Sequence, residues 1–182
     1  VHAGLIVGAK EAGTWPRSGG QPFSLTVAAW DYLRGLQAMN TKSGQGFVAM
    51  WFSDKMTTAW SDGIRPLEAD TGFKMIRVDN LQFNEDICDK IVSEIRRSRF
   101  VVAEVTGQRP GVYFEAGFAM GLGLPVIWVC REDDFDSVHF DARQYNHIVW
   151  SEVGQLREKL RDRILATVGV GPMFRGPDIT RP

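Results

Sequence analysis

The sequence predicts an α/β domain built on a doubly wound, mainly parallel sheet of five strands with helices on both faces. Two observations predict this fold. Apolar runs alternate with segments of helical periodicity from residue 46 onward, a pattern typical of strand–helix–strand units. Each run is also followed by a polar loop. Because crossover connections between parallel strands are right-handed, the helices are expected on both sides of the sheet.

The elements follow from local patterns. Pro66 is expected to disturb the end of the first helix, since proline lacks an N–H and clashes within a helix. In the last helix, Leu156, Leu160 and Ile164 recur at every fourth residue, with Ser151 as the expected N-cap. The expected strands are residues 47–52, 73–78, 100–105, 125–130 and 147–150, and the expected helices are residues 55–69, 85–97, 112–122 and 152–168.

The chain is expected to divide into a small N-terminal extension or docking segment, residues 1–44, and an α/β domain, residues 45–182. The first part has a short apolar run at 5–7, a Gly/Pro/Ser-rich loop, and an amphipathic helix pattern at 25–39. We therefore expect it to attach or dock the domain rather than carry a separate activity.

Bulk composition excludes several classes of protein. The 182 residues include 21 basic and 22 acidic ones, a net charge of −1, so no global field recruits nucleic acid or an anionic membrane. Cys88 and Cys130 have no CxxC partner and are predicted to be reduced core residues. The His and carboxylate spacing predicts no metal site. With no apolar run near 18 residues and no signal peptide, we expect a cytoplasmic protein.

Glu115 is the main candidate for chemistry. It is the one acid in the helix expected at 112–122, whose other positions are small or apolar. Such a helix is normally buried, and a carboxylate is seldom buried without compensation. Glu115 is expected near the helix start, where the helix dipole favours its ionised form. The alternative is structural: Glu115 caps backbone or pairs with an arginine.

The topology places a site around Glu115. In open parallel sheets, ligands bind beyond the carboxyl ends of the strands at the topological switch point. The polar loops expected there are 53–54, 79–84, 106–111 and 131–136. The loop at Asp79 and Asn80 is open to a simpler interpretation as a turn and helix cap. Asp86 is likewise favoured at a helix start by the dipole alone.

The order of an apolar strand, the run AEVTGQRPGVYFEAG, a small-residue helix and LPVIWV resembles the nucleoside 2-deoxyribosyltransferase superfamily. Within it, the chain is most similar to nucleotide N-glycosidases, which remove the base from nucleoside 5′-monophosphates. The likeness covers roughly residues 46–150 and implies a flavodoxin-like fold, a homodimer and no cofactor. It implies that Glu115 is the nucleophile. FVAMWF at 47–52 looks like the strand that lines the base and sugar pocket.

The resemblance and the positions of the loops together give the expected site. N-glycoside cleavage passes through an oxocarbenium-like state that a carboxylate stabilises, while a second group protonates the leaving base. Aromatic side chains stack on the base, and arginines or helix N–H groups hold a phosphate. The expected catalytic residues are Glu115, Asp79, Asp86 and Tyr113. The expected substrate-binding residues are Met50, Trp51, Phe52, Asn80, Arg109, Gly111, Val112, Arg143, Asn146 and His147.

The chain departs from the family pattern at three points. Arg109 stands where the transferases have an acid six residues before the nucleophile, and Ile91 stands at their helix Asp. Residues 51–54, WFSD, replace the Gly-rich phosphate loop. A differently specific or non-catalytic member therefore stays open. Toll/interleukin-1-receptor-like domains also place a Glu beside such a sheet, so a nucleotide-sensing or NAD-cleaving effector module of a bacterial defence or signalling protein is the alternative function.

Overall fold

The structure, a computed structural model, describes residues 6–7, 24–26, 40–78 and 86–176. The chain forms two units, Val1–Met39 and Asn40–Pro182. In the first, β1 (Ile6–Val7) and β2 (Ser24–Leu25) pair antiparallel. The helix expected at 25–39 falls mostly outside the described residues, although Leu25 belongs to β2. The predicted boundary between residues 44 and 45 stays a prediction.

The described part of the second unit is a parallel five-stranded sheet in the order β4-β3-β5-β6-β7. The predicted doubly wound α/β fold is therefore confirmed. Each predicted strand is present, with ends that differ by up to two residues. In chain order the strands are β3 (Gln45–Met50), β4 (Lys74–Ile76), β5 (Phe100–Glu104), β6 (Val126–Arg131) and β7 (His147–Trp150).

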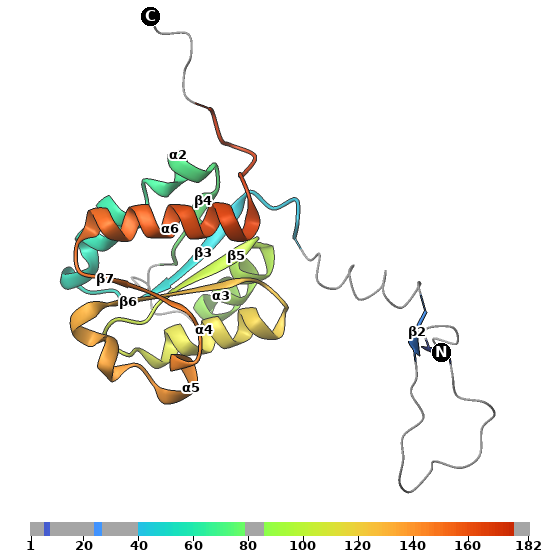
Figure 1. Ribbon diagram of the computed structural model, residues 1–182, viewed down its shortest axis with the longest axis horizontal. Coiled ribbons are helices and arrows are strands. Elements are labelled where there is room, and N and C mark those ends of the chain that lie inside the picture. The colour runs from blue at the N-terminus through green and yellow to red at the C-terminus, as the bar shows by residue number, and fades with distance from the viewer. Residues whose placement is uncertain (1–5, 8–23, 27–39, 79–85, 177–182) are drawn as a thin grey trace, which may run out of the picture. The chain divides into compact units, whose positions relative to one another are not determined.

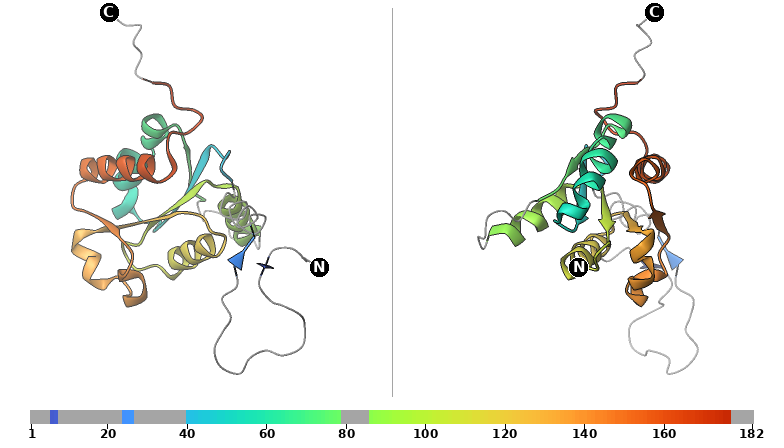
Figure 2. Two further views of the ribbon diagram at one scale, coloured as in Figure 1. Left: turned by 45° about the vertical axis from the view of Figure 1, so that its right-hand side comes forward. Right: turned by 90° about the vertical axis from the view of Figure 1, so that its left-hand side faces the viewer.

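Helices cover both faces of the sheet (Figures 1 and 2). One face carries the π-helix η2 (Ala59–Ile64), α2 (Leu67–Thr71) and α6 (Val153–Val168), and the other carries α3 (Asp86–Arg97) and α4 (Pro110–Gly121). Side chains alternate along each strand, so β3 and β5 supply both cores. Val48 and Val102 lie in the first core, whereas Ala49 and Ala103 lie in the second.

Two sequence-based expectations for helices are wrong. The single helix expected at 55–69 is broken into the 3₁₀ helix η1 (Asp54–Met56), η2 and α2. Pro66 cannot donate a backbone hydrogen bond, and the Arg65 N–H bonds to the Trp60 carbonyl five residues back. Glu152, not Ser151, is the N-cap of α6, and it makes no side-chain capping bond.

The region between β6 and β7, expected to be a loop, contains the 3₁₀ helix η3 (Glu132–Ser137) and the short helix α5 (Phe140–Arg143). Neither has the length over which periodicity is visible in a sequence. By contrast, the predicted end of α4 is confirmed, because Gly123 follows it with a φ of +74°. The exposed side chain of Cys88 on α3 corrects its prediction as a core residue, while Cys130 is buried.

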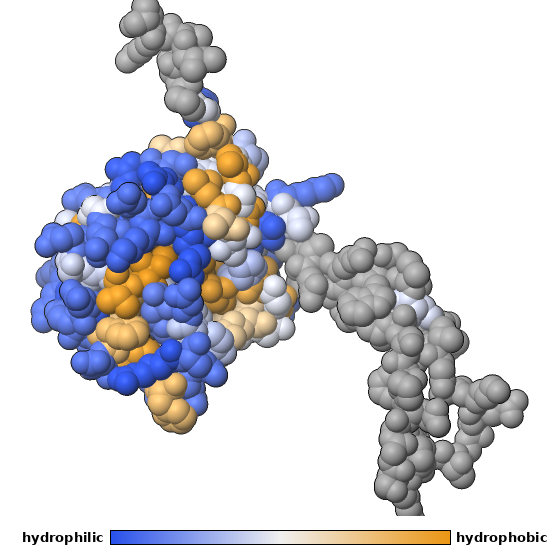
Figure 3. All heavy atoms as spheres, in the orientation of Figure 1, coloured by the Kyte–Doolittle hydropathy of each residue, from blue (hydrophilic) through white to orange (hydrophobic). Residues whose placement is uncertain are grey.

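The expectation that the central helix is buried on every side is also wrong. Phe114 on α4 is 63% exposed and stacks on Phe118, and Met120 is 39% exposed. On α5, Phe140 is 75% exposed, and apolar atoms protrude at the position of α5 in Figure 3. The sheet and α3 leave the outer face of α4 uncovered, which its all-apolar sequence does not reveal.

Candidate active site

The switch point lies between β3 and β5. The chain runs from β3 outward to β4 and then returns through α3 to β5 on the other side of β3. Loops leaving β3 and β5 therefore diverge at their carboxyl ends, where ligands bind in folds of this kind. The β3 loop begins with Trp51 and Phe52, and the β5 loop runs from Thr106 to Arg109 into α4.

Glu115 lies on the helix that starts at this edge. Pro110 begins α4, where its missing N–H leaves no helical bond unmade. Val112, Ala116 and Ala119 form the buried stripe of α4, and Glu115 flanks it in the second turn. The Glu115 side chain is half-buried, and among the described residues it has no hydrogen bond or ion pair.

Burial raises the pKa of Glu115 to about 7. The helix dipole was expected to favour the ionised form. That expectation is not met, because α4 begins two residues earlier than predicted and Glu115 lies beyond the first turn, where the dipole acts most. Near neutral pH, both protonation states of such a carboxyl are populated. It can serve as a nucleophile when ionised or as an acid when protonated.

The β5–α4 loop has a constrained backbone. Gly107 and Gln108 both have positive φ, +80° and +51°, and left-handed φ is uncommon for a residue other than glycine. Asp134 of η3 holds this conformation, because its carboxylate accepts the Gly107 N–H at 2.6 Å and the Gln108 side-chain amide at 2.8 Å. Backbone strain of this kind clusters at functional sites.

Two arginines stack on the aromatic residues that follow β3. The Arg109 guanidinium lies 4.2 Å from the ring centre of Trp51, and that ring packs so closely on Gly107 that a Cβ there would lie 2.5 Å from it. Arg77, after β4, lies 4.9 Å from the ring centre of Phe52 and 3.9 Å from the Met50 sulfur. Stacking leaves the edges of the planar Arg109 guanidinium able to bind an anion.

Tyr113 lies apart from Glu115. Each helical residue turns about 100°, so their side chains leave α4 about 160° apart. The Tyr113 hydroxyl donates to the Gln108 side chain at 2.5 Å, and its ring contacts Trp128 and His139. Burial raises the pKa of this hydroxyl. Tyr113 thus supports the β5–α4 loop from the η3 side, and its predicted catalytic role stays a prediction.

The structure does not bring the other three distant candidates to the switch point. The Arg143 side chain donates to the backbone carbonyls of Val138 and Asp136. Asn146 lines a hollow at the amino end of β6. The His147 Nδ1–H donates to the Tyr145 carbonyl at 2.8 Å, and the ring packs on Trp128 and Phe135. Burial lowers the pKa of His147.

Of the remaining candidates, Gly111 is exposed and Val112 buried in the first turn of α4. Asp79 and Asn80 lie outside the described residues. Asp86 begins α3, but its side chain is also outside them. Their roles stay predictions.

Sequence reasoning missed four side chains at this edge: Arg77, Glu104, Thr106 and Asp134. Glu104 ends β5 and is fully buried, with its pKa raised to about 7 chiefly by burial. The signal that singled out Glu115, an acid within an apolar run, was equally present at Glu104. Asp134 carried no such signal, since it lies among other acids.

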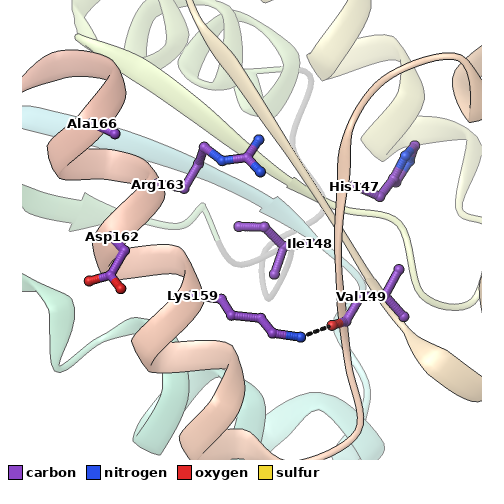
Figure 4. Close-up of a pocket in the computed structure, with 7 residues that line it drawn as sticks. All are labelled: His147, Ile148, Val149, Lys159, Asp162, Arg163 and Ala166. Atoms are coloured by element: carbon purple, nitrogen blue, oxygen red, sulfur yellow. Dashed lines mark hydrogen bonds between the residues drawn. The ribbon is translucent and has the colours of Figure 1, made fainter.

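Two surface hollows, each of about 440 Å³, lie away from Glu115. The first lies between α6 and the edge strand β7 (Figure 4), where Lys159 donates to the Val149 carbonyl at 2.8 Å. The second lies beside the start of β6. The candidate catalytic side chains and the surface hollows therefore lie in different places. Both hollows are shallow and open, and neither is lined by Glu115 or by a residue of the β5–α4 loop.

Among the described residues, no three His, Cys, Asp or Glu side chains are grouped so that they could bind a metal ion. No helix in that part of the chain is both long and apolar enough to cross a membrane.

No profile of a known protein family matches the chain, and no curated protein matches it. Among solved structures, the CMP N-glycosidase BcmB of Clostridium botulinum has a similar fold, with a TM-score of 0.52 at 21% sequence identity. The match covers 65% of this chain and 98% of that one. At this identity the likeness concerns the fold, and the resemblance inferred from residues 100–129 is confirmed at that level.

Proposed function

We propose that this protein cleaves the N-glycosidic bond of a nucleotide, with Glu115 as the nucleophile. The observation that carries the proposal is the half-buried Glu115 carboxyl, which has no partner among the described residues and lies on the helix that leaves the switch point. Support also comes from the fold, which is similar to that of an enzyme that acts on CMP. A half-buried carboxyl without a partner has no evident structural role. Carboxyl groups whose pKa is shifted in this way cluster at functional sites.

In the proposed reaction, a Glu115 carboxylate oxygen bonds to the anomeric carbon of the sugar. The carbon–nitrogen bond breaks, and its electron pair leaves with the base nitrogen, which takes up a proton. Water then hydrolyses the glycosyl ester, which releases the sugar phosphate and regenerates Glu115. Asp79 and Asp86 stay the predicted candidates for the group that protonates the base.

A 5′-nucleotide fits the charges at this edge better than a neutral nucleoside. Arg109 is exposed at the N-cap of α4, with its guanidinium stacked on Trp51. Helix N-termini and arginines both favour phosphate. These groups offer a replacement for the Gly-rich phosphate loop that the sequence lacks.

The test is release of free base, measured by liquid chromatography. The wild type and Glu115→Gln are incubated with ribonucleoside and deoxyribonucleoside monophosphates, the matching nucleosides, and NAD. We expect the wild type to release base from a monophosphate, and Glu115→Gln to lower kcat at least about 10³-fold. Glu158→Gln, an exposed position on α6, is the matched control and should keep full activity.

Other outcomes decide against the proposal. Base release by Glu115→Gln at the wild-type rate would remove Glu115 from the mechanism. Consumption of NAD alone would favour the NAD-cleaving effector. Stoichiometric binding of a nucleotide without turnover, measured by calorimetry on the folded protein, would favour a sensing module.

A further inference from the structure

We propose that Glu104 is a positioning residue that fixes the β5–α4 loop and, through it, the helix that carries Glu115. This role rests on the proposed function for its kinetic readout, but its structural content is independent of it. Glu104 does not reach the protein surface, since it is fully buried at the carboxyl end of β5. It lies between Met50 of β3 and Val129 of β6 in the pairing of the strands.

Glu104 belongs to a hydrogen-bond network that joins the ends of three strands. Its Oε1 accepts the Thr106 hydroxyl at 2.5 Å and the Trp150 indole N–H, at the end of β7, at 3.3 Å. The Thr106 oxygen in turn accepts the Arg131 N–H, at the end of β6, at 2.9 Å. The network therefore ties the ends of β5, β6 and β7 directly beneath the loop.

Thr106 is the link from this network to the active site. It is the residue before Gly107 and Gln108, whose positive φ values set the direction of the chain into α4. Asp134 holds the same two residues from the other side. Two carboxyls thus hold neighbouring residues of the loop, the buried Glu104 at Thr106 and the half-buried Asp134 at Gly107 and Gln108. Such supporting bonds are what fixes a catalytic side chain in place.

The second oxygen argues against a purely architectural role. Glu104 Oε2 is buried without a hydrogen-bond partner among the described residues. An unpaired buried oxygen is costly, and an apolar side chain of similar size would fill the space without that cost. The presence of an acid here is explained by the hydrogen bond that it accepts from Thr106 of the loop. Facing it from the neighbouring strand β6 are the Arg131 and Cys130 side chains.

The test compares two pairs of variants in the base-release assay. Thr106→Val removes the hydroxyl, whereas Thr106→Ser keeps it. Glu104→Met removes the acceptor, whereas Glu104→Gln keeps it. We expect Thr106→Val and Glu104→Met each to lower kcat about tenfold or more while KM changes less than about threefold, and the two conservative variants to retain most activity. The double variant Glu104→Met/Thr106→Val should be no slower than the worse single one, because both break one network.

Nuclear magnetic resonance supplies a readout that needs no turnover. In the wild type, the Gly107 and Gln108 amide signals and the Trp150 indole signal should shift together as pH passes through about 7. In folded Glu104→Gln they should not. Failure of base release with these shifts present would sink the proposed function but not the positioning role. Unchanged kcat in folded Thr106→Val, additive losses in the double variant, or loop signals that ignore Glu104 would overturn the positioning role.

Discussion

Two carboxyl groups, Glu104 and Glu115, share one electrostatic situation on either side of the β5–α4 loop. Each has its pKa raised to about 7, and burial is the largest cause for both. They differ in their partners. Hydrogen bonds from Thr106 and Trp150 and the charge of Arg131 oppose the shift at Glu104, whereas no described residue bonds to Glu115. The first is held in place, and the second is available to react.

The rate of base release should therefore depend on pH. A nucleophilic carboxylate must be ionised, so kcat should rise as pH increases toward about 7 and level off above it. A pH series of kcat from about 5 to 9 measures this. A rate that falls as pH rises through 7 would instead assign Glu115 the role of an acid.

The stability of Glu115→Gln should exceed that of the wild type at high pH. Since the folded state raises the Glu115 pKa, it favours the protonated form. The stability that protonated Glu115 contributes to the folded state is complete below pH 4.5 and is lost as pH rises through about 7. Gln stays neutral throughout. After a discount for partial exposure, we expect a gain of about 1–2 kcal/mol at pH 8 and almost none at pH 4. Urea unfolding at both pH values measures it, and equal gains would contradict it.

At the scale of elements, an ion pair between α2 and α6 stabilises the helices on the face of the sheet opposite Glu115. Arg157 on α6 makes a two-pronged ion pair with Asp70 on α2, at 2.6 and 2.8 Å. This bond lowers the pKa of Asp70. It also fixes the short helix that follows the Pro66 break, which has only five residues and little stability of its own. Tertiary contact thus replaces the long helix that periodicity predicts.

Replacing Asp70 should measure that contact. We expect Asp70→Asn to lower the free energy of unfolding by about 0.5–1 kcal/mol at pH 7, because the pair is partly exposed. The contribution of Asp70 is present above its ordinary pKa of 3.8 and is lost as pH falls through the lower folded value. Chemical denaturation tests this. Asp162→Asn breaks an exposed pair within α6 and should change almost nothing.

At the scale of the molecule, two residues that precede the predicted domain bond to the end of α3. Asn40 and Ser43 lie before residue 45, yet their side chains donate to carbonyls at the end of α3. The Ser43 hydroxyl donates to the Arg97 carbonyl at 2.5 Å, and the Asn40 amide donates to the Ser98 carbonyl at 3.0 Å. Residues 40–44 therefore cap a helix of the α/β unit, whereas polar composition alone marks them as a connector.

Two truncations should separate these boundaries. A chain that starts at Asn40 should unfold at nearly the temperature of the full chain. A chain that starts at Gln45 should be less stable by about 1–3 kcal/mol, since the carbonyls at the end of α3 lose their donors. Thermal and urea unfolding compare the two. Equal stability would place the working boundary at residue 44, and a large loss in the longer chain would show that residues 1–39 support the fold.

The sequence by itself determined the strand positions, the doubly wound sheet and the place of Glu115. These depend on periodicity and on an acid among apolar residues, which are local signals. Only the tertiary structure decided that Asn146 lies at the far end of the strands and that Glu104, Thr106 and Trp150 meet. The reason is physical. Such contacts join residues up to 46 positions apart, and the pairing of whole strands brings them together.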